Sequence, residues 1–202
     1  MDIIIEYISN HHIDIAGASI GLLYLYLEYK ANIWMWLVSI IMAVFFVYIF
    51  YSTQLYANMI IYTYFFGASI YGWIAWHTKN RDNSTGGHIL LRIPETDRGK
   101  VIILVFSAFL TISLLLYWLT DNKLLILLGD AFTTALNVIA LWMASRKWAE
   151  QWCLLIPANL LSAILLFVQG EYASSGMFFT YFIVSIFGYL NWRRIADSKA
   201  TP

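Results

Sequence analysis

The chain has 202 residues, of which 61% are hydrophobic, 18% aromatic and only 12% charged, and its formal net charge is zero. A soluble domain of this length carries about 25% charged residues, so the composition indicates a protein embedded in a lipid bilayer. The zero net charge and the lack of a basic run argue against nucleic-acid binding. A single cysteine, Cys153, excludes an internal disulfide and a cysteine-based metal site.

Seven apolar segments predict an all-α membrane protein with seven transmembrane helices. The segments cover about residues 13–29, 33–51, 55–77, 101–119, 123–145, 148–169 and 172–192. The first is short and carries Asp14 and Glu28 at its ends, so it is the weakest of the seven. Residues 78–100 are polar, contain glycine and are broken by Pro94, which predicts a loop.

The basic residues predict the orientation of the chain. Of the Lys and Arg residues, one predicted side of the membrane carries only Lys123. The opposite side carries Lys30, Lys79, Arg81, Arg92, Arg98, Lys100, Arg146, Lys147, Arg193, Arg194 and Lys199. Cytoplasmic loops are enriched in Lys and Arg, so we expect residues 78–100 and the C-terminus in the cytoplasm and the N-terminus outside. This arrangement requires an odd number of spans, which favours seven.

An internal repeat is visible when the chain is shifted by 116 residues, which lays residues 14–76 over residues 130–192 without a gap. The matched pairs include Asp14 with Asp130, Trp36 with Trp152, Gly72 with Gly188, and Trp76 with Trp192. The repeat predicts two parallel three-helix bundles, residues 1–77 and 123–202, joined by a cytoplasmic loop and linker helix at 78–122. Parallel repeats are a transporter architecture with a solute site between the halves near mid-membrane. The alternative is that unrelated helix ends share similar chemistry.

Residues 146–170, RKWAEQWCLLIPANLLSAILLFVQG, contain the most informative predicted helix. Trp152 and Asn159 lie seven residues apart and share a helical face. Pro157 removes a backbone donor between them and is expected to kink the helix. An indole and an amide near mid-membrane suit a polar solute with a ring. The alternative is a packing helix in which Asn159 bonds a neighbouring helix and Trp152 lies in the interfacial belt.

The other candidate site residues come from the neighbouring spans of the second repeat. Asp130, Thr133, Thr134 and Asn137 form a polar stripe on the predicted helix 123–145. A polar stripe in a bilayer is costly unless it faces a partner or water, although mutual bonding of Asn137 and Asn159 is an alternative explanation. The complete set of predicted substrate-binding residues is Trp152, Asn159, Asn137, Tyr181, Asp130, Thr134, Ser185 and Trp36.

Trp76 and Trp192 lie beside the predicted cytoplasmic charges, and we expect them to be interfacial belt residues. No catalytic residue, metal or cofactor is predicted, because the chain lacks a phosphate-binding Gly-rich motif and its histidines have no metal-ligand spacing. It also lacks a Ser–His–Asp or Cys–His arrangement at one membrane depth. With no carboxylate near the midplane, passive uniport is favoured over ion coupling.

Three long stretches resemble the Pnu-type bacterial vitamin transporters, which include carriers of nicotinamide riboside, thiamine and riboflavin. They are STQLYANMIIYTYFFGASIYGWIAW, DAFTTALNVIALWMASRKWAEQW and EYASSGMFFTYFIVSIFGYLNWRR. The resemblance implies a three-plus-one-plus-three, SWEET-like helix arrangement in the bacterial inner membrane. It also implies a homotrimer and facilitated diffusion, with the substrate trapped by cytoplasmic phosphorylation.

In nicotinamide riboside carriers, the helix that resembles residues 148–169 carries a W-x-x-W-x-x-x-N pattern. Trp152 and Asn159 match this pattern, but Leu155 replaces the second tryptophan. Thiamine is therefore the preferred substrate and nicotinamide riboside the alternative; aromatic faces would hold the thiazolium and asparagine amides the pyrimidine edge. A non-transporting membrane scaffold or sensor would instead have a dry contact between the repeats, and an intramembrane enzyme would need paired catalytic groups.

Overall fold

The computed structural model describes residues 12–78, 90–120 and 123–198, and within these ranges the chain forms seven α-helices. The all-helical prediction is therefore confirmed. Five of the helices, α3, α5, α6, α7 and α8, are long and apolar enough to cross a membrane. The helices are α2 (His12–Tyr29), α3 (Trp34–Ser52), α4 (Tyr56–Thr78), α5 (Glu95–Leu119), α6 (Leu124–Ser145), α7 (Gln151–Val168) and α8 (Tyr172–Ser198).

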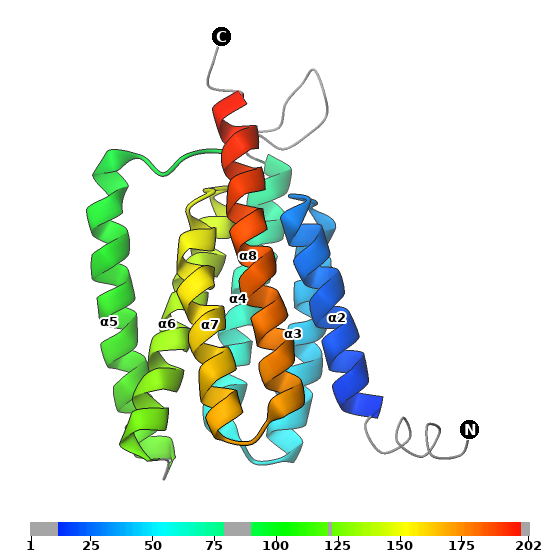
Figure 1. Ribbon diagram of the computed structural model, residues 1–202, viewed down its shortest axis with the longest axis vertical. Coiled ribbons are helices and arrows are strands. Elements are labelled where there is room, and N and C mark those ends of the chain that lie inside the picture. Colours follow the sequence, from blue (N-terminus) through cyan, green and yellow to red (C-terminus); the bar gives the residue numbers. More distant parts are fainter. Residues whose placement is uncertain (1–11, 79–89, 121–122, 199–202) are drawn as a thin grey trace.

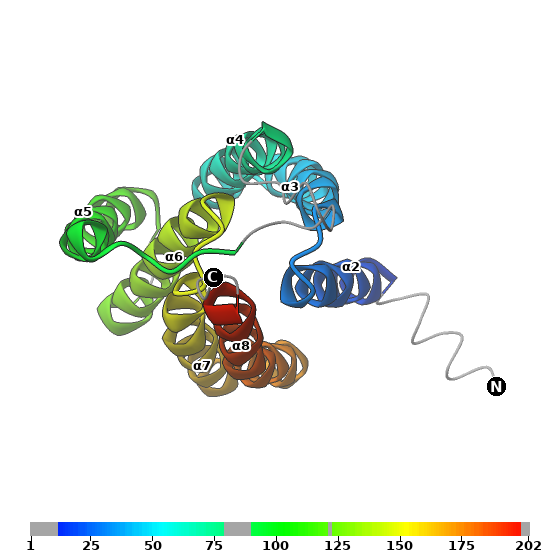
Figure 2. The ribbon, with the colours of Figure 1, turned by 90° about the horizontal axis from the view of Figure 1, so that it is seen from above.

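Six helices form a closed ring, and α5 packs outside it. Neighbours in the ring follow the order α2, α3, α4, α6, α7 and α8, and α8 packs against α2 to close it. The view from above shows α3 and α4 on one side, α7 and α8 on the opposite side, and α5 outside against α6 (Figure 2). The helices run roughly along one common direction (Figure 1).

The outer surface of the bundle is apolar. On α5, the side chains of Ile102, Phe106, Leu114 and Trp118 are each between 62% and 81% exposed. Contiguous exposed apolar surface of this kind marks contact with a membrane or a partner. The exposure pattern therefore agrees with helices whose outer faces contact lipid.

Several helix ends differ from the predicted spans. α5 begins at Glu95 and α8 continues to Ser198, so residues 95–100 are helical and the loop prediction is wrong for them. Glu95 and Asp97 lie in the first turn of α5, where carboxylates favour the helix N-terminus, and Lys100 pairs with Asp97 at 2.7 Å. Hydropathy detects only the apolar part of a helix, which is why these polar turns were missed. Residues 79–89 of the predicted loop, and the side chain of Asp14, lie outside the described part of the chain.

A short strap, residues 90–94, docks on the turn between α6 and α7. The backbone N–H of Leu91 donates to the carbonyl of Lys147, and the N–H of Ala149 donates to the carbonyl of Leu91, both at 2.9 Å. Arg92 then bonds Glu150 at 2.6 Å and Asp197 at 3.0 Å. These bonds raise the pKa of the Arg92 guanidinium, Glu150 contributing most. The strap thus ties the start of α5 to the start of α7 and the end of α8, and residues 148–150 belong to this turn rather than to the predicted helix.

The turns of the two predicted bundles share an unusual backbone conformation. Among the described residues, left-handed φ values occur at Ala31 (51°), Gln54 (61°), Lys147 (64°) and Gly170 (85°). The four residues form two pairs, Ala31 with Lys147 and Gln54 with Gly170, and each pair is 116 positions apart. Left-handed backbone is disfavoured for residues other than glycine, so its occurrence at matched positions is informative. The matched conformations agree with the repeat, which stays a prediction.

Candidate solute site

Four tryptophans, which we call the tryptophan layer, fill the centre of the ring near the end that carries the α2–α3 and α6–α7 turns. Trp36, Trp76, Trp152 and Trp192 are all 0% exposed. Their ring centroids are 5.9 Å apart from Trp36 to Trp76, 6.1 Å from Trp76 to Trp192, and 5.9 Å from Trp192 to Trp152. These separations are typical of aromatic pairs, so the four indoles form one continuous chain across the ring.

The prediction that Trp76 and Trp192 are interfacial belt residues is wrong. Both lie close to a helix end, as predicted, but on the inner face of the ring. Position along a span indicates depth and says nothing about which face of the helix a residue occupies. By contrast, Trp34 is 55% exposed and Trp118 is 81% exposed, as expected for the belt.

Two members of the layer bond across the two halves of the molecule. The Nε1–H of Trp76 on α4 donates to the carbonyl of Ala144 on α6 at 3.0 Å. The Nε1–H of Trp192 on α8 donates to the carbonyl of Glu28 on α2 at 2.9 Å. Both the donors and the acceptors are related by 116 positions, so the two bonds are reciprocal. They hold the halves together at the layer.

The other two members of the layer keep unpaired donors. The Nε1 atoms of Trp36 and Trp152 are buried and have no hydrogen-bond partner among the described residues. Each ring is pressed against a glycine, and a Cβ at Gly188 would lie 2.7 Å from the Trp152 ring. Gly72 faces Trp36 in the same way. An unpaired buried donor costs about 1–3 kcal/mol, so a ligand or water that accepts these N–H groups would be favoured.

Asn159 lies inside the ring and is held by Ser185. Its Nδ2 donates to the Ser185 Oγ at 2.9 Å, and that hydroxyl donates to the carbonyl of Tyr181, one turn earlier on α8, at 2.7 Å. Asn159 is 6% exposed and Ser185 is 0% exposed. The asparagine thus faces protein and not lipid.

The orientation of the Asn159 amide follows from how the serine uses its single proton. That proton is donated to the Tyr181 carbonyl, so the Ser185 Oγ can only accept from Asn159. Ser69, which lies 116 positions before Ser185, likewise donates to the carbonyl one turn earlier, that of Phe65, at 2.6 Å. Its second contact, at 2.7 Å, is with Ser39, which matches Leu155 and not Asn159. The Asn159 Oδ1 accepts none of these hydrogen bonds and remains available as an acceptor.

The remaining predicted site residues are less closely associated. Asn137 donates its Nδ2 to the carbonyl of Thr133 on its own helix at 2.9 Å, so the suggested bond between Asn137 and Asn159 is wrong. Asp130, Thr134 and Asn137 are only partly buried on α6. Tyr181 is partly buried against the cluster that contains the tryptophan layer.

Tyr181 also closes the ring above the layer. Its hydroxyl occupies the place that a side chain at Gly21 of α2 would need, so α8 and α2 approach closely at this point. Trp152 and Tyr181 therefore belong to one packed cluster, but Trp152 lies against Gly188 and Trp192. The predicted sandwich of a solute ring between Trp152 and Tyr181 stays a prediction.

Sequence reasoning missed a polar pair at the same level. The carboxylate of Glu28 accepts from Gln151 Nε2 at 3.1 Å, and the two residues are 3% and 0% exposed. In the sequence, Glu28 indicates only that the first predicted span is the weakest of the seven. The signal available was a carboxylate in an otherwise apolar segment, which in a membrane protein indicates an inward-facing, paired side chain.

Two hollows are lined by residues outside the predicted site. One, of about 220 Å³, lies between α4 and the α6–α7 turn, and the other, of about 420 Å³, lies between α3 and α4. None of the eight predicted site residues lines either hollow. In this conformation the tryptophan layer and Tyr181 occupy the centre of the ring.

Known proteins similar to this chain share its length and fold. The family model described as nicotinamide mononucleotide transporter matches residues 11–194. The nicotinamide riboside transporters PnuC of Escherichia coli (strain K12) and Shigella flexneri are each 27% identical over 210 residues, which cover 94% of this chain and 88% of theirs. The crystal structure of the vitamin B3 transporter PnuC has a TM-score of 0.75 at 19% identity, over 98% of this chain and 87% of that one, and so shares the fold.

The family match spans nearly the whole chain, including all seven helices. It agrees with the resemblance seen in the three long sequence stretches and with the apolar outer surface of the helices. This chain belongs to the nicotinamide mononucleotide transporter family of multi-pass membrane proteins, as a Pnu-type vitamin transporter.

Proposed function

We propose that this protein carries nicotinamide riboside across the bacterial inner membrane by facilitated diffusion. The relatives named for that substrate favour it over thiamine. The observation on which the proposal depends is the Asn159–Ser185 pair, which presents a fixed acceptor, Oδ1, inside the ring of helices. The carboxamide N–H₂ of nicotinamide can donate to this oxygen, whereas the carboxylate of the corresponding acid has no proton to donate at neutral pH.

The full set of seven helices spans the membrane in this proposal, with the N-terminus outside and the C-terminus in the cytoplasm. α2 and α4 have 18 and 23 residues, or about 27 and 34 Å at 1.5 Å per residue, which is close to the thickness of the hydrocarbon core. Both helices are members of the closed ring whose other members are long and apolar. The distribution of Lys and Arg supports the orientation.

The tryptophan layer is the inner gate in this proposal. It closes the ring at the end that carries most of the basic residues, and its two reciprocal bonds join α4 to α6 and α8 to α2. Those are also the two places where the halves pack against each other. Rocking of one three-helix bundle against the other would break both bonds together and expose Asn159 to the cytoplasm. Trapping by phosphorylation and assembly as a homotrimer are carried over from the family resemblance.

Thiamine remains the second candidate because of one residue. Leu155 stands where the resembling nicotinamide riboside carriers have a second tryptophan, and it is partly buried against the cluster that contains the tryptophan layer. A leucine removes one aromatic face and makes room for a different ring system. The aminopyrimidine of thiamine also has an N–H₂ group that can donate to Asn159.

Uptake into proteoliposomes tests the proposal. Purified protein is reconstituted, and the uptake of labelled nicotinamide riboside, nicotinic acid riboside and thiamine is compared with that of protein-free vesicles. We expect uptake of nicotinamide riboside down its gradient, without an imposed ion gradient, and little uptake of the acid. Uptake of thiamine alone would support the second candidate, and no uptake of any of these would support a scaffold or sensor.

A further inference from the structure

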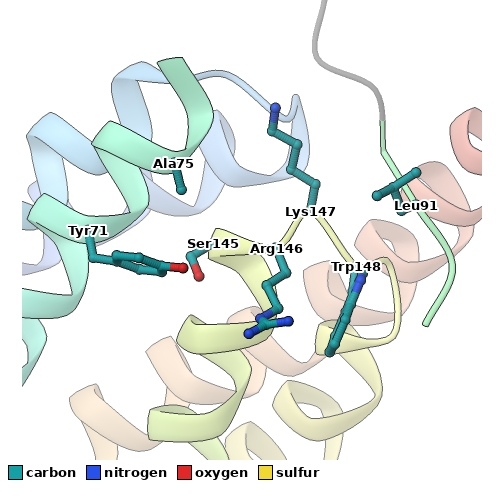
Figure 3. Close-up of a pocket in the computed structure, with 7 residues that line it drawn as sticks. All are labelled: Tyr71, Ala75, Leu91, Ser145, Arg146, Lys147 and Trp148. Carbon is teal, nitrogen blue, oxygen red and sulfur yellow. The ribbon is translucent and has the colours of Figure 1, made fainter. Parts of the chain in front are cut away.

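The hollow of about 220 Å³ lies away from the ring centre, at the basic end of the bundle. Its walls are Tyr71 and Ala75 of α4, Leu91 of the strap, and residues 145–148 at the end of α6. The hydroxyl of Tyr71 points towards Ser145, and the guanidinium of Arg146 lies beside Trp148 (Figure 3). Nothing in the proposed transport cycle uses this hollow.

Arg146 supplies a cation that is fixed in place. Its guanidinium carbon lies 4.5 Å from the ring centroid of Trp142 and 5.3 Å from that of Trp148. It forms no ion pair with any residue of the described ranges. Stacking on indoles orients the guanidinium plane and leaves its N–H donors available at the edge. A planar set of donors is the preferred partner of a phosphate group.

The surface that continues from this hollow into the membrane is apolar and open. On α4, a Cβ added at Gly67 would meet no atom within 4 Å, and Ile70 and Ile74 are 38% and 54% exposed. Two turns before Tyr71 on α4, the hydroxyl of Tyr64 donates to the carbonyl of Val138 and joins α4 to α6. Acyl chains would therefore find contact surface directly below the cation.

We propose that this hollow binds the phosphodiester headgroup of an anionic phospholipid of the cytoplasmic leaflet. Arg146 pairs with the phosphate, the Tyr71 hydroxyl donates a second hydrogen bond, and the acyl chains lie along α4. Ser145 already donates to the carbonyl of Trp142 at 2.6 Å, so its oxygen accepts from a headgroup hydroxyl. Basic pockets between transmembrane helices on the cytoplasmic side are known to hold such headgroups. A bound lipid would bridge the two halves where α4 meets the α6–α7 turn.

Native mass spectrometry of the purified full-length protein tests this site with phosphatidylglycerol and phosphatidylcholine added separately. We expect phosphatidylglycerol to be retained about fivefold more strongly, the effect of one basic side chain near a membrane surface. The Arg146→Gln variant should lose this preference. Arg98→Gln is the matched control, since Arg98 is an exposed residue at the same end that pairs only weakly with Glu95, at 3.5 Å. It should retain the preference.

A second variant and a soluble competitor complete the test. Tyr71→Phe keeps the ring and removes one donor, so it should weaken phosphatidylglycerol retention partly, even if Arg146→Gln fails to fold. Glycerol 3-phosphate and inorganic phosphate should not displace the lipid. Equal retention of the two lipids, or an unchanged preference in Arg146→Gln, would overturn the proposal. Displacement by the soluble phosphates would overturn its lipid part and assign the hollow to a free phosphate ester.

Discussion

At the scale of single residues, the serine on α8 that holds Asn159 has a matched counterpart on α4. Ser185 accepts from Asn159, and Ser69 contacts Ser39 on α3. Each serine also donates to the carbonyl one turn earlier. The partners of the two serines do not match in the repeat, because Asn159 corresponds to Ala43 and Ser39 corresponds to Leu155.

Ser185→Ala should weaken the binding of nicotinamide riboside, because Asn159 loses the acceptor that fixes its amide. Loss of one buried hydrogen bond of this kind costs about 1–2 kcal/mol, or roughly a fivefold to thirtyfold increase in Kd. Ser69→Ala removes an equivalent helix–helix contact and should leave the Kd within about twofold, since no amide depends on it. Isothermal titration calorimetry of the purified variants measures both. Equal effects of the two substitutions would show that Ser185 has only a packing role.

Polarity in an apolar segment was the signal for several of the predicted site residues, and their part in solute binding stays a prediction. Asn159 stood out as an amide in an apolar segment, and it does lie inside the ring. The suggested pairing of Asn137 with Asn159 failed because an asparagine in a helix can bond the carbonyl four residues earlier, and Asn137 does so. The prediction that Trp76 and Trp192 are belt residues is wrong for a different reason. The depth of a residue along a span does not determine which face of the helix it occupies.

At the scale of elements, the α3–α4 and α7–α8 turns have the same backbone but different residues. Gln54 follows α3 with φ 61°, and Gly170 follows α7 with φ 85°. In both turns the next residue, Leu55 or Glu171, donates its N–H to the carbonyl five residues earlier at 2.9 Å. Such a turn ends a helix with a left-handed residue, for which glycine is preferred.

Gln54→Gly should stabilise the protein, because the left-handed backbone costs a residue with a Cβ about 1–2 kcal/mol and glycine much less. The greater entropy of glycine in the unfolded chain offsets part of this gain, which leaves roughly 0.5–1 kcal/mol. Gly170→Gln should destabilise the protein by a comparable amount. Thermal unfolding in detergent compares the two with the parent chain. A lower Tm for Gln54→Gly would show that the glutamine side chain makes a contribution larger than the strain.

The extent of the helices was predictable only in part. Each of the seven apolar segments coincides with one helix to within a few residues, because apolar length is a strong signal. The polar first turn of α5 and last turns of α8 extend beyond the apolar segments and contain local ion pairs such as Arg193 with Asp197 at 3.5 Å. The start of α5 could have been predicted from its cap, because Pro94 is followed by two carboxylates in the first turn, a pattern typical of a helix N-terminus.

At the scale of the whole molecule, the shift of 116 residues pairs positions of the two predicted bundles but does not indicate which helices pack against each other. The closed ring arises because α8 packs on α2 and α4 packs on α6. Both contacts join residues far apart in the sequence, and local pattern carries no information about them. The tryptophan layer lies where these contacts meet, so it could be recognised only once the ring was known.

Trp76→Phe and Trp192→Phe should each weaken the closure of the ring, and by similar amounts. Each keeps an aromatic ring but removes an N–H that bonds the other half. The carbonyls of Glu28 and Ala144 retain one backbone partner each, the N–H of Ala31 and of Lys147. The loss is therefore that of a typical buried hydrogen bond plus a little packing, about 1–2 kcal/mol per variant. Thermal unfolding in detergent measures it, with Trp34→Phe, a change at an exposed tryptophan, as the control.

If the tryptophan layer is the inner gate, the double variant should also spend more time open towards the cytoplasm. Acrylamide in the aqueous phase should then quench the fluorescence of Trp36 and Trp152 more strongly than in the parent protein, because both indoles lose their cover. Nicotinamide riboside that binds the closed ring should reduce this extra quenching, since a ligand shifts the equilibrium towards the state that it prefers. Unchanged quenching together with a lowered Tm would mean that the two bonds stabilise the fold without controlling access to Asn159.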